Sequence, residues 1–216
     1  MELLALDVTL RSAASYAKEP NLALLLSQYI KSVSSSCSAP GTLNIYPSAV
    51  VTLYPNDTPT GLRSEQKERI RAVPSWRHGP GRYDTVLISA APGVTTLSGF
   101  AVDRVRLLFR FRAKDANHDC ALVHHYLTLG AAPDYDTNMW VVQRVLQRGT
   151  LHAQIIPLSD IHRPIQLIPV YLNQRKIPKS LSYNTCLDHE HFRKFYVNKY
   201  SDHHAYEILS DFSVVV

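Results

Sequence analysis

Residues 102–112 read VDRVRLLFRFR, and this stretch is the clearest indication of the fold class. Apolar residues recur at every second position in its second half, and arginines alternate with them. The apolar set is Val105, Leu107, Phe109 and Phe111, and the arginine set is Arg104, Arg106, Arg110 and Arg112. Because neighbouring side chains on a strand point to opposite faces, the pattern predicts a β-strand with one core face and one arginine face.

Short runs of β-branched and aromatic residues occur on both sides of this strand. They predict strands at 43–54, 83–89, 102–112, 121–129, 139–144, 152–156 and 165–170. Turn-rich spacers separate them, at 55–61, 78–81 and around 133–136. Short strands without long intervening helices favour a mainly β (α+β) fold, a small antiparallel barrel or sandwich of about seven strands.

Helices are expected at both ends of the chain. The run LALLLSQYIKSV at 22–33 has helical spacing, and residues 187–209 suggest a second helix with Asp188 as its cap. The stretch SSSCSAPG at 34–41 disfavours helix. We therefore expect a helical N-terminal segment and linker at 1–40, and a β-rich domain with a C-terminal helix at 41–216.

Composition favours an acidic partner and a reducing compartment. Lys and Arg number 23 against 18 Asp and Glu, which suits nucleic acid phosphates. Cys37, Cys120 and Cys186 are odd in number and form no CxxC pair, which disfavours a disulfide framework and a thiolate zinc site. We expect no secretory signal, because the opening MELLALDVTL lacks a basic n-region and a clean apolar stretch before a cleavage site. We expect no membrane partner, because no run approaches the roughly 20 apolar residues of a membrane helix.

Two basic segments are candidates for a nucleic-acid interface. One is the arginine face, and the other extends from Arg63 to Arg82 with aromatic residues among its cations. The candidate nucleic-acid-binding residues are Arg69, Arg71, Trp76, Arg77, Arg82, Arg104 and Arg106. The alternatives are a solvated arginine face balanced by acids on neighbouring strands, and Trp76 and Tyr83 as core anchors beside a turn.

Catalytic and metal motifs are weak. The histidine strings at 188–191 and 202–204 lack the i, i+4 pair of a zincin helix, so solvated or packed histidines are expected. Cys120 lies in a strand pattern where a buried, inert thiol is expected. Asp134 and Asp136 indicate an Asx-type turn rather than paired carboxylates. We therefore expect no catalytic residue, metal or cofactor; a hydrolase using His203 and His204 is the weaker alternative.

An aromatic cage for a methylated lysine is a further hypothesis, because several rings fall at expected strand ends or loops. These are Tyr83, Tyr126, Tyr135 and Trp140.

Several long strings resemble, in the same order, segments of Plavaka-type transposases from fungal genomes. They are RIRAVPSWRHGPGRYDTVLIS at 69–89, RVRLLFRF at 104–111, PDYDTNMWVV at 133–142, IQLIPVY at 165–171 and FRKFYVNKYSDHHAYEI at 192–208. The resemblance covers about 43–209 and implies the C-terminal region of a DDE-type transposase, whose RNase H-like catalytic core lies upstream. His124 and His125 depart from the family, which tends to have an acid followed by Trp.

The resemblance implies a nuclear, non-catalytic accessory or targeting module that binds DNA or chromatin, beside a partner transposase subunit or a second copy of itself. The alternative is a protein-interaction or oligomerisation domain with no nucleic-acid role. Exposure of Leu24, Leu25 and Leu26 on the first helix would support that alternative.

Overall fold

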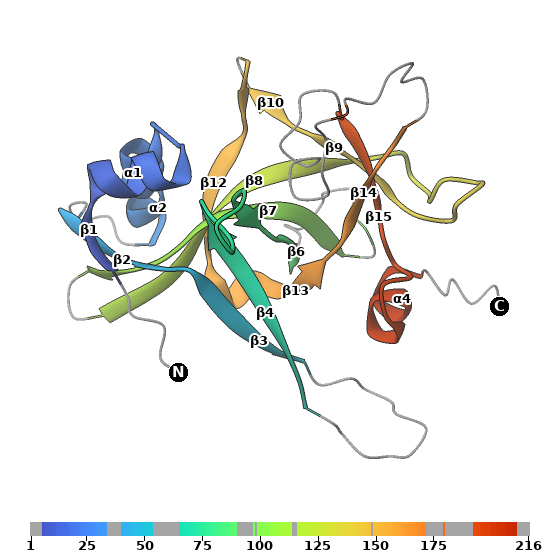
Figure 1. Cartoon of the computed structure of the whole chain (residues 1–216), viewed down its shortest axis with the longest axis horizontal. Coiled ribbons are helices and arrows are strands. Elements are labelled where there is room, and N and C mark those ends of the chain that lie inside the picture. The colour runs from blue at the N-terminus through green and yellow to red at the C-terminus, as the bar shows by residue number, and fades with distance from the viewer. Residues whose placement is uncertain are drawn as a thin grey trace.

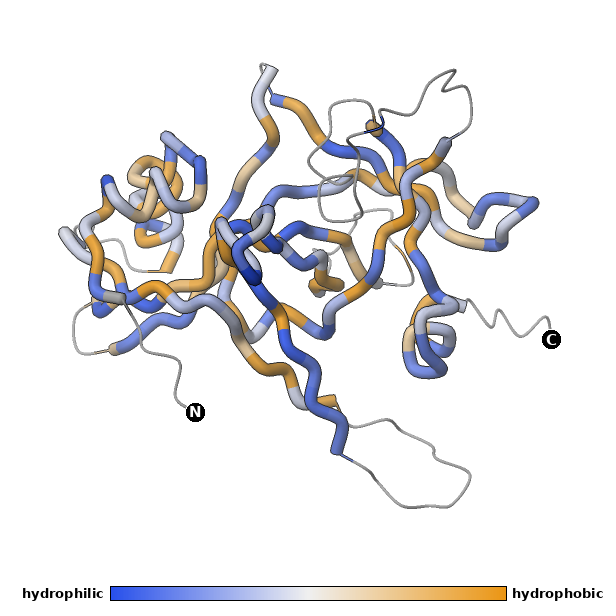
Figure 2. Tube along the Cα trace, viewed as in Figure 1, coloured by the Kyte–Doolittle hydropathy of each residue, from blue (hydrophilic) through white to orange (hydrophobic). Residues whose placement is uncertain are grey.

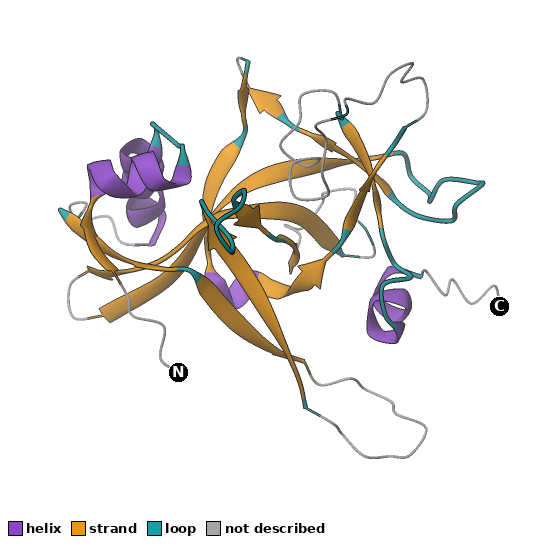
Figure 3. Cartoon of the chain, in the orientation of Figure 1, coloured by secondary structure: helices purple, strands orange, loops and turns teal. Residues whose placement is uncertain are grey.

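The computed structural model describes residues 6–33, 40–53, 65–89, 97, 99–113, 116–147, 149–171, 179 and 192–210. Antiparallel strands dominate these residues, so the predicted mainly β, α+β fold is confirmed as a sandwich-like arrangement rather than a closed barrel (Figure 3). The described helices are α1 (Leu10–Ala17), α2 (Leu22–Val33) and α4 (His203–Leu209), with a 3-10 turn η1 (Leu158–Asp160). The strands are β1 (Leu6–Thr9), β2 (Thr42–Tyr46), β3 (Ser48–Leu53), β4 (Gln66–Val73), β5 (Arg82–Tyr83), β6 (Thr85–Ser89), β7 (Phe100–Ala113), β8 (Ala116–Leu129), β9 (Val141–Arg144), β10 (Leu146–Gln147), β11 (Thr150–Leu151), β12 (Ala153–Pro157), β13 (Ile161–Ile165), β14 (Leu167–Pro169) and β15 (Lys194–Val197).

The hairpin of β7 and β8 is the centre of the fold, and it crosses the middle of the molecule in Figure 1. The large sheet has the order β1-β2-β7-β8-β9-β15-β14. Three further strands attach to it: β6 pairs with β7, β13 pairs with β6, and β12 pairs with β8. The strands β3, β4 and β5 form a separate three-stranded sheet.

Three apolar clusters surround this hairpin. The first joins β8, β9, β14 and β15 to α4, and the second joins α1 and α2 to β2, β7 and β8. The third holds Ile70 and Ala72 of the three-stranded sheet against β6, β7 and β8. The long strand β7 is therefore covered on both faces along most of its length, which explains why nine consecutive residues from Ala101 to Phe109 are buried.

The simple alternation expected for 102–112 is wrong at Arg106. The register changes from Val105 opposite Val123 to Leu107 opposite Leu122, so Arg106 is the extra residue of a β-bulge. A bulge reverses the alternation beyond it. Val105 consequently packs in the third cluster, while Leu107 packs in the second with Phe109 and Phe111.

The N-terminal helix is confirmed at the predicted bounds, as α2. Its residues Leu22, Leu26 and Ile30 are fully buried at spacings of four. The strand β1 also pairs with β2, on the far side of the expected linker. Described residues on both sides of that linker therefore share one apolar cluster. Positions 34–39 of the linker, including Cys37, lie outside the described residues.

The predicted C-terminal helix is wrong at residues 194–197. They form β15, which pairs with β9 and β14, and among the described residues of the predicted span the helix is confined to His203–Leu209. Phe195 and Val197 are buried and alternate with more exposed neighbours, a period-two pattern that the helical interpretation overlooked. The cap of α4 is Asp202, whose carboxylate accepts the Ala205 amide at 2.9 Å; Asp188 lies outside the described residues.

Other strand boundaries also differ from the prediction. The run 43–54 contains two strands, β2 and β3, separated at Pro47. The strands that the prediction missed include β4 and β13, whose apolar pattern is interrupted by charged residues and a proline. The turn at Asp134 is confirmed, since its carboxylate accepts the amide and the hydroxyl of Thr137. Among the described residues, no helix is both long and apolar enough to span a membrane.

The guanidinium of Arg163 fixes α4 and β4 to β13. Its side chain is 2% exposed, and its two terminal nitrogens donate to both carboxylate oxygens of Asp202 at 3.0 and 2.7 Å. One nitrogen also donates to Glu68 of β4 at 2.9 Å, and the other to Nδ1 of His204 at 3.1 Å. A forked guanidinium thus satisfies groups from two distant elements at once.

We predict that Arg163→Met lowers the free energy of unfolding by about 3 kcal/mol, because Glu68 and Asp202 would then face one another without a cation. The matched control is Arg110→Met, whose guanidinium pairs with Asp119 at 2.6 Å on the surface. Removal of an exposed pair costs less than about 1 kcal/mol. Equal losses in the two variants, measured by urea denaturation, would contradict this role.

Candidate nucleic-acid interface

The site is built on the hairpin of β4 and β5. Ala72 lies opposite Tyr83 and Val73 lies opposite Arg82, and the chain reverses through residues 74–81. At the tip, Trp76 and Gly79 bracket a tight turn in which Arg77 and His78 have φ of 51° and 62°. Both central residues of a type I′ turn require such left-handed angles, which are costly for residues other than glycine.

Three guanidinium groups surround the ring of Trp76. Those of Arg71, Arg77 and Arg82 lie 4.8, 5.6 and 5.6 Å from the ring centroid. Trp76 is half-buried, whereas Arg77 is exposed. The predicted grouping of cations with this aromatic residue is therefore present, and we call Arg71, Trp76, Arg77 and Arg82 the Trp76 cluster.

The Trp76 cluster concentrates positive charge beside the carboxylate of Asp84. Asp84 accepts a hydrogen bond from Arg82 Nε at 2.9 Å, and its other oxygen accepts the backbone amide of Arg71. Burial, and then the charges of Arg82, Arg69 and Arg77, lower the pKa of Arg71, while Asp84 offsets part of this effect. A bound anion would relieve the repulsion among these like charges.

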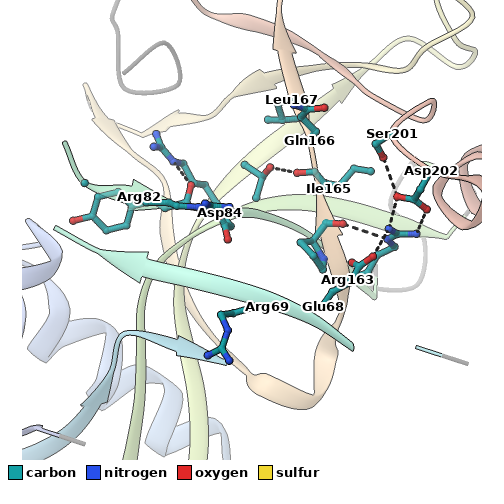
Figure 4. A pocket seen from close by; sticks show the side chains of 15 residues that line it. Glu68, Arg69, Arg82, Asp84, Arg163, Ile165, Gln166, Leu167, Ser201 and Asp202 are labelled. Carbon is teal, nitrogen blue, oxygen red and sulfur yellow. Dashed lines mark hydrogen bonds and ion pairs between the residues drawn. The ribbon is translucent and has the colours of Figure 1, made fainter. Parts of the chain in front are cut away.

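A cleft of about 560 Å³ opens beside the cluster (Figure 4). Arg69, Arg82 and Asp84 line one side, and the ion pairs of Arg163 form the other. Arg69 reaches across to β3, where it donates to the hydroxyl of Ser48 at 2.9 Å. Figure 2 shows that β4 is hydrophilic in its first half, where the sequence is QKER, and alternates between hydrophilic and hydrophobic residues in its second half.

Gly81 lets the chain pass close to Tyr83. A Cβ at this position would lie 2.8 Å from the Tyr83 ring and 3.0 Å from the carbonyl oxygens of Pro74 and Val73. Two of these three neighbours are backbone atoms that cannot move aside. Gly81, the second glycine of the HGPG string, is therefore required by a close approach rather than by a positive φ.

The expectation that Arg104 and Arg106 stand on an exposed strand face is wrong. Both side chains are nearly buried, and their guanidinium groups lie 5.7 and 3.9 Å from the centre of the Tyr83 ring. Arg106 also donates to the carbonyl oxygen of Ala17 at the end of α1. The bulge and the covering helix turn this part of the arginine face inward, whereas Arg112 remains exposed and Arg110 pairs with Asp119.

The expectation that Tyr83 anchors the core is confirmed, and that for Trp76 is not. Tyr83 is 6% exposed and belongs to the third apolar cluster. The aromatic cage is contradicted, because Tyr126 and Trp140 are buried in a different cluster and Tyr135 is 99% exposed.

The remaining chemical candidates have other roles. Cys120 is buried as expected, and burial raises the pKa of its thiol to about 11. Asp202 and His204 of the histidine string contact Arg163, and His203 pairs with Glu207 at 2.9 Å. No group of His, Cys, Asp and Glu able to hold a metal occurs among the residues that the structure describes. The string at 188–191, Cys186 and Arg63 lie outside them.

Two groups of residues were missed by sequence reasoning. One is Arg163, which stands in an unremarkable strand and finds its acids 39 and 95 positions away. The other is the cross-strand pair of Asp103 and His125, whose Oδ1 and Nδ1 atoms lie 2.7 Å apart. The register near the turn, with Ala113 opposite Ala116, would place Asp103 opposite Tyr126 without a bulge, and the bulge at Arg106 moves it opposite His125.

No protein-family model, curated protein or solved structure matches this chain.

The strained turn yields a stability prediction at His78. We expect His78→Gly to be more stable than His78→Ala by about 1 kcal/mol, since alanine is strained at positive φ. The control position is Ser75, which is not among the described residues with a positive φ. Ser75→Ala should therefore be more stable than Ser75→Gly. The same order at both positions, measured by thermal unfolding, would refute a left-handed turn at the tip.

His204 gives a pH prediction. Burial and the adjacent Arg163 lower its pKa below 6.5, although Asp202 and Glu207 oppose the shift. The unfolded chain therefore takes up this proton first as the pH falls, and stability is lost on acidification through 6.5. His204→Asn keeps an oxygen acceptor for Arg163 but does not titrate.

The free energy of unfolding should consequently fall more in the unmodified protein than in His204→Asn between pH 7.5 and pH 5. Urea denaturation at both pH values checks this. Parallel losses in the two proteins would show that His204 does not contribute to the pH dependence.

Proposed function

We propose that this chain is a non-catalytic module that binds nucleic acid through the Trp76 cluster, as an accessory or targeting region of a transposase-derived protein. The observation that supports it is the gathering of three guanidinium groups around one half-buried indole at the tip of a hairpin. The DNA or chromatin partner and the nuclear location rest on the resemblance of 43–209 to Plavaka-type transposases.

The geometry favours phosphate contacts over base stacking. Guanidinium groups already lie within 6 Å of the Trp76 ring, so the ring orients cations rather than offering a bare platform. A guanidinium over a ring face can still direct the N–H groups of its own plane outward, where phosphate oxygens accept them. Phosphate contacts position a protein on nucleic acid without reading its sequence.

The cleft provides a continuation of the cationic surface. Arg69 lies on β4 two residues before Arg71, and its neighbour in the cleft, Arg82, belongs to the Trp76 cluster. At a rise of about 3.3 Å per residue, Arg69 and Arg71 are spaced by about 7 Å along the strand. That interval is similar to the phosphate spacing of a nucleic acid strand, as expected for a chain laid along β4.

The protein-interaction alternative has less support. Of the three leucines expected on an exposed helix face, Leu24 is 58% exposed, Leu25 is half-buried and Leu26 is fully buried against the sheet. A single exposed leucine does not make an apolar docking patch.

The test is binding of a labelled duplex and a labelled single strand across a salt series. For a duplex, log K should fall linearly with log salt concentration, with a slope of about −0.9 per phosphate neutralised. In the triple variant Arg69→Ala, Arg71→Ala, Arg77→Ala the slope should be shallower by about one for each phosphate that the variant no longer neutralises.

The matched control is the triple variant Arg11→Ala, Lys31→Ala, Arg112→Ala, whose exposed cations stand on α1, α2 and β7. Both variants lower the formal net charge of +5 by three. If the control loses as much affinity as the hairpin variant, binding reflects overall charge and the Trp76 cluster is not the site. Absence of binding at low salt would reject a nucleic-acid role.

A further inference from the structure

The outer face of β4 carries a straight row of cations. Ile70 and Ala72 pack in the third apolar cluster, so the residues that alternate with them on β4 turn away from the core. The row consists of Lys67, Arg69 and Arg71. The first two are exposed and the third is partly buried. At a rise of about 3.3 Å per residue the row is about 13 Å long. It ends at Trp76, whose ring centroid lies 4.8 Å from the Arg71 guanidinium.

A neutral row accompanies these cations on β3. The two strands lie side by side in Figure 1 and pair in antiparallel register. Because directly opposite residues share a face of the sheet, Ser48, Val50 and Thr52 stand on the same face as the cations. Ala49 and Val51 face the other way and pack against the third cluster. The sequence of β3 is SAVVTL, so this row has no charge.

The neutral row places one apolar side chain between two hydroxyl groups. Val50 is 51% exposed. Ser48 and Thr52 on either side of it each bear a hydroxyl, which can donate to or accept from the polar edge of a base. The Ser48 hydroxyl also accepts a hydrogen bond from Arg69 Nη1 at 2.9 Å, which connects the two rows.

The carboxylates of β4 and its start leave the row of cations open. Glu68 alternates with the cations and faces Arg163, which donates to it at 2.9 Å. Glu65 lies 3.2 Å from Lys67, but the two side chains are 48% and 64% exposed. Exposed ion pairs are weak, so a phosphate can take the place of this carboxylate.

We propose that the outer face of β3 and β4 is the track of a single nucleic acid strand, with its phosphates along the cations of β4 and its bases turned over β3. This inference rests on the proposed function and adds the kind of nucleic acid and its path. A cationic groove that follows the backbone, with rings and other groups beside it for the bases, is the usual arrangement of single-strand sites.

The straightness of the row favours a single strand over a duplex. A flexible strand can extend along a line of cations. The backbone of a duplex winds once round its axis in about 35 Å, so it would turn by about a third of a turn over the length of the row. Unpaired bases can also reach Val50, whereas the bases of a duplex are stacked inside it.

The test is the affinity of a fluorescently labelled pyrimidine-rich 12-nucleotide strand, alone and annealed to its complement, measured by anisotropy. We expect the Kd of the single strand to be at least about fivefold lower, the effect of one favourable base contact. In Lys67→Gln the slope of log K against log salt for the single strand should be shallower by about 0.7, the loss of one phosphate contact. Lys31→Gln removes an exposed cation from α2 and should leave the slope unchanged.

A gain of affinity tests the path over β3 without relying on a loss of folding. Val50→Tyr adds a ring to the neutral row at an exposed position, and tyrosine is favoured in strands. It should lower the Kd of the single strand at least about fivefold through stacking and leave that of the duplex within about twofold. The control is Leu24→Tyr on α2, at a position that is 58% exposed, which should change neither Kd.

The possible failures are distinguishable. A duplex that binds as tightly as the single strand, or more tightly, would overturn the single-strand track and leave a nucleic-acid role of the Trp76 cluster standing. Equal responses to Val50→Tyr and Leu24→Tyr would overturn the path over β3. Absence of binding by both nucleic acids at low salt would reject the proposed function and this inference together.

Discussion

The antiparallel pairing of β7 with β8 holds the molecule together. Each strand has 14 residues, and every apolar cluster includes residues from at least one of them. Helices α1 and α2 cover one end of the hairpin, the three-stranded sheet covers its middle, and β9, β14, β15 and α4 adjoin the other end (Figure 1). Burial on both faces is what makes this pair a core rather than a surface ribbon.

Such burial also determines what the arginines of β7 can do. A guanidinium taken from water must regain its hydrogen bonds, and a cluster of them favours an anion nearby. The bulge at Arg106 places this residue and Arg104 beside Tyr83 and the end of α1. The exposed guanidinium of Arg77 and the partly buried ones of Arg71 and Arg82, which gather around Trp76, lie instead on the next layer, at the β4–β5 hairpin.

The sequence was informative wherever a local pattern matched a tertiary role. Helix α2, the strands β7 and β8, the turn at Asp134 and the buried Cys120 were predicted, because spacing or turn chemistry specified each of them. The grouping of Arg71, Arg77 and Arg82 with Trp76 was also predicted. A hairpin of known length brings such residues together without long-range information.

The errors arose where distant contacts outweighed local preference. Nothing local marks Arg106 as a bulge, and its inward position follows from α1, which is 89 residues away in its hydrogen bond to Ala17. Residues 194–197 have ambiguous apolar spacing, and pairing with β9 and β14 decides that they are a strand. Arg163 gives no signal, because its acids come from β4 and the cap of α4.

If nucleic acid contacts the tip of the β4–β5 hairpin, Trp76 is a natural reporter of that contact. The chain has two tryptophans, and Trp140 is only 3% exposed, so Trp140→Phe leaves Trp76 as the sole indole. Titration of this variant with DNA should change Trp76 emission saturably, with a midpoint that moves to higher DNA concentration as salt is raised. Unchanged emission under conditions where a labelled DNA is bound would contradict binding at the hairpin, because the DNA would then lie elsewhere on the protein.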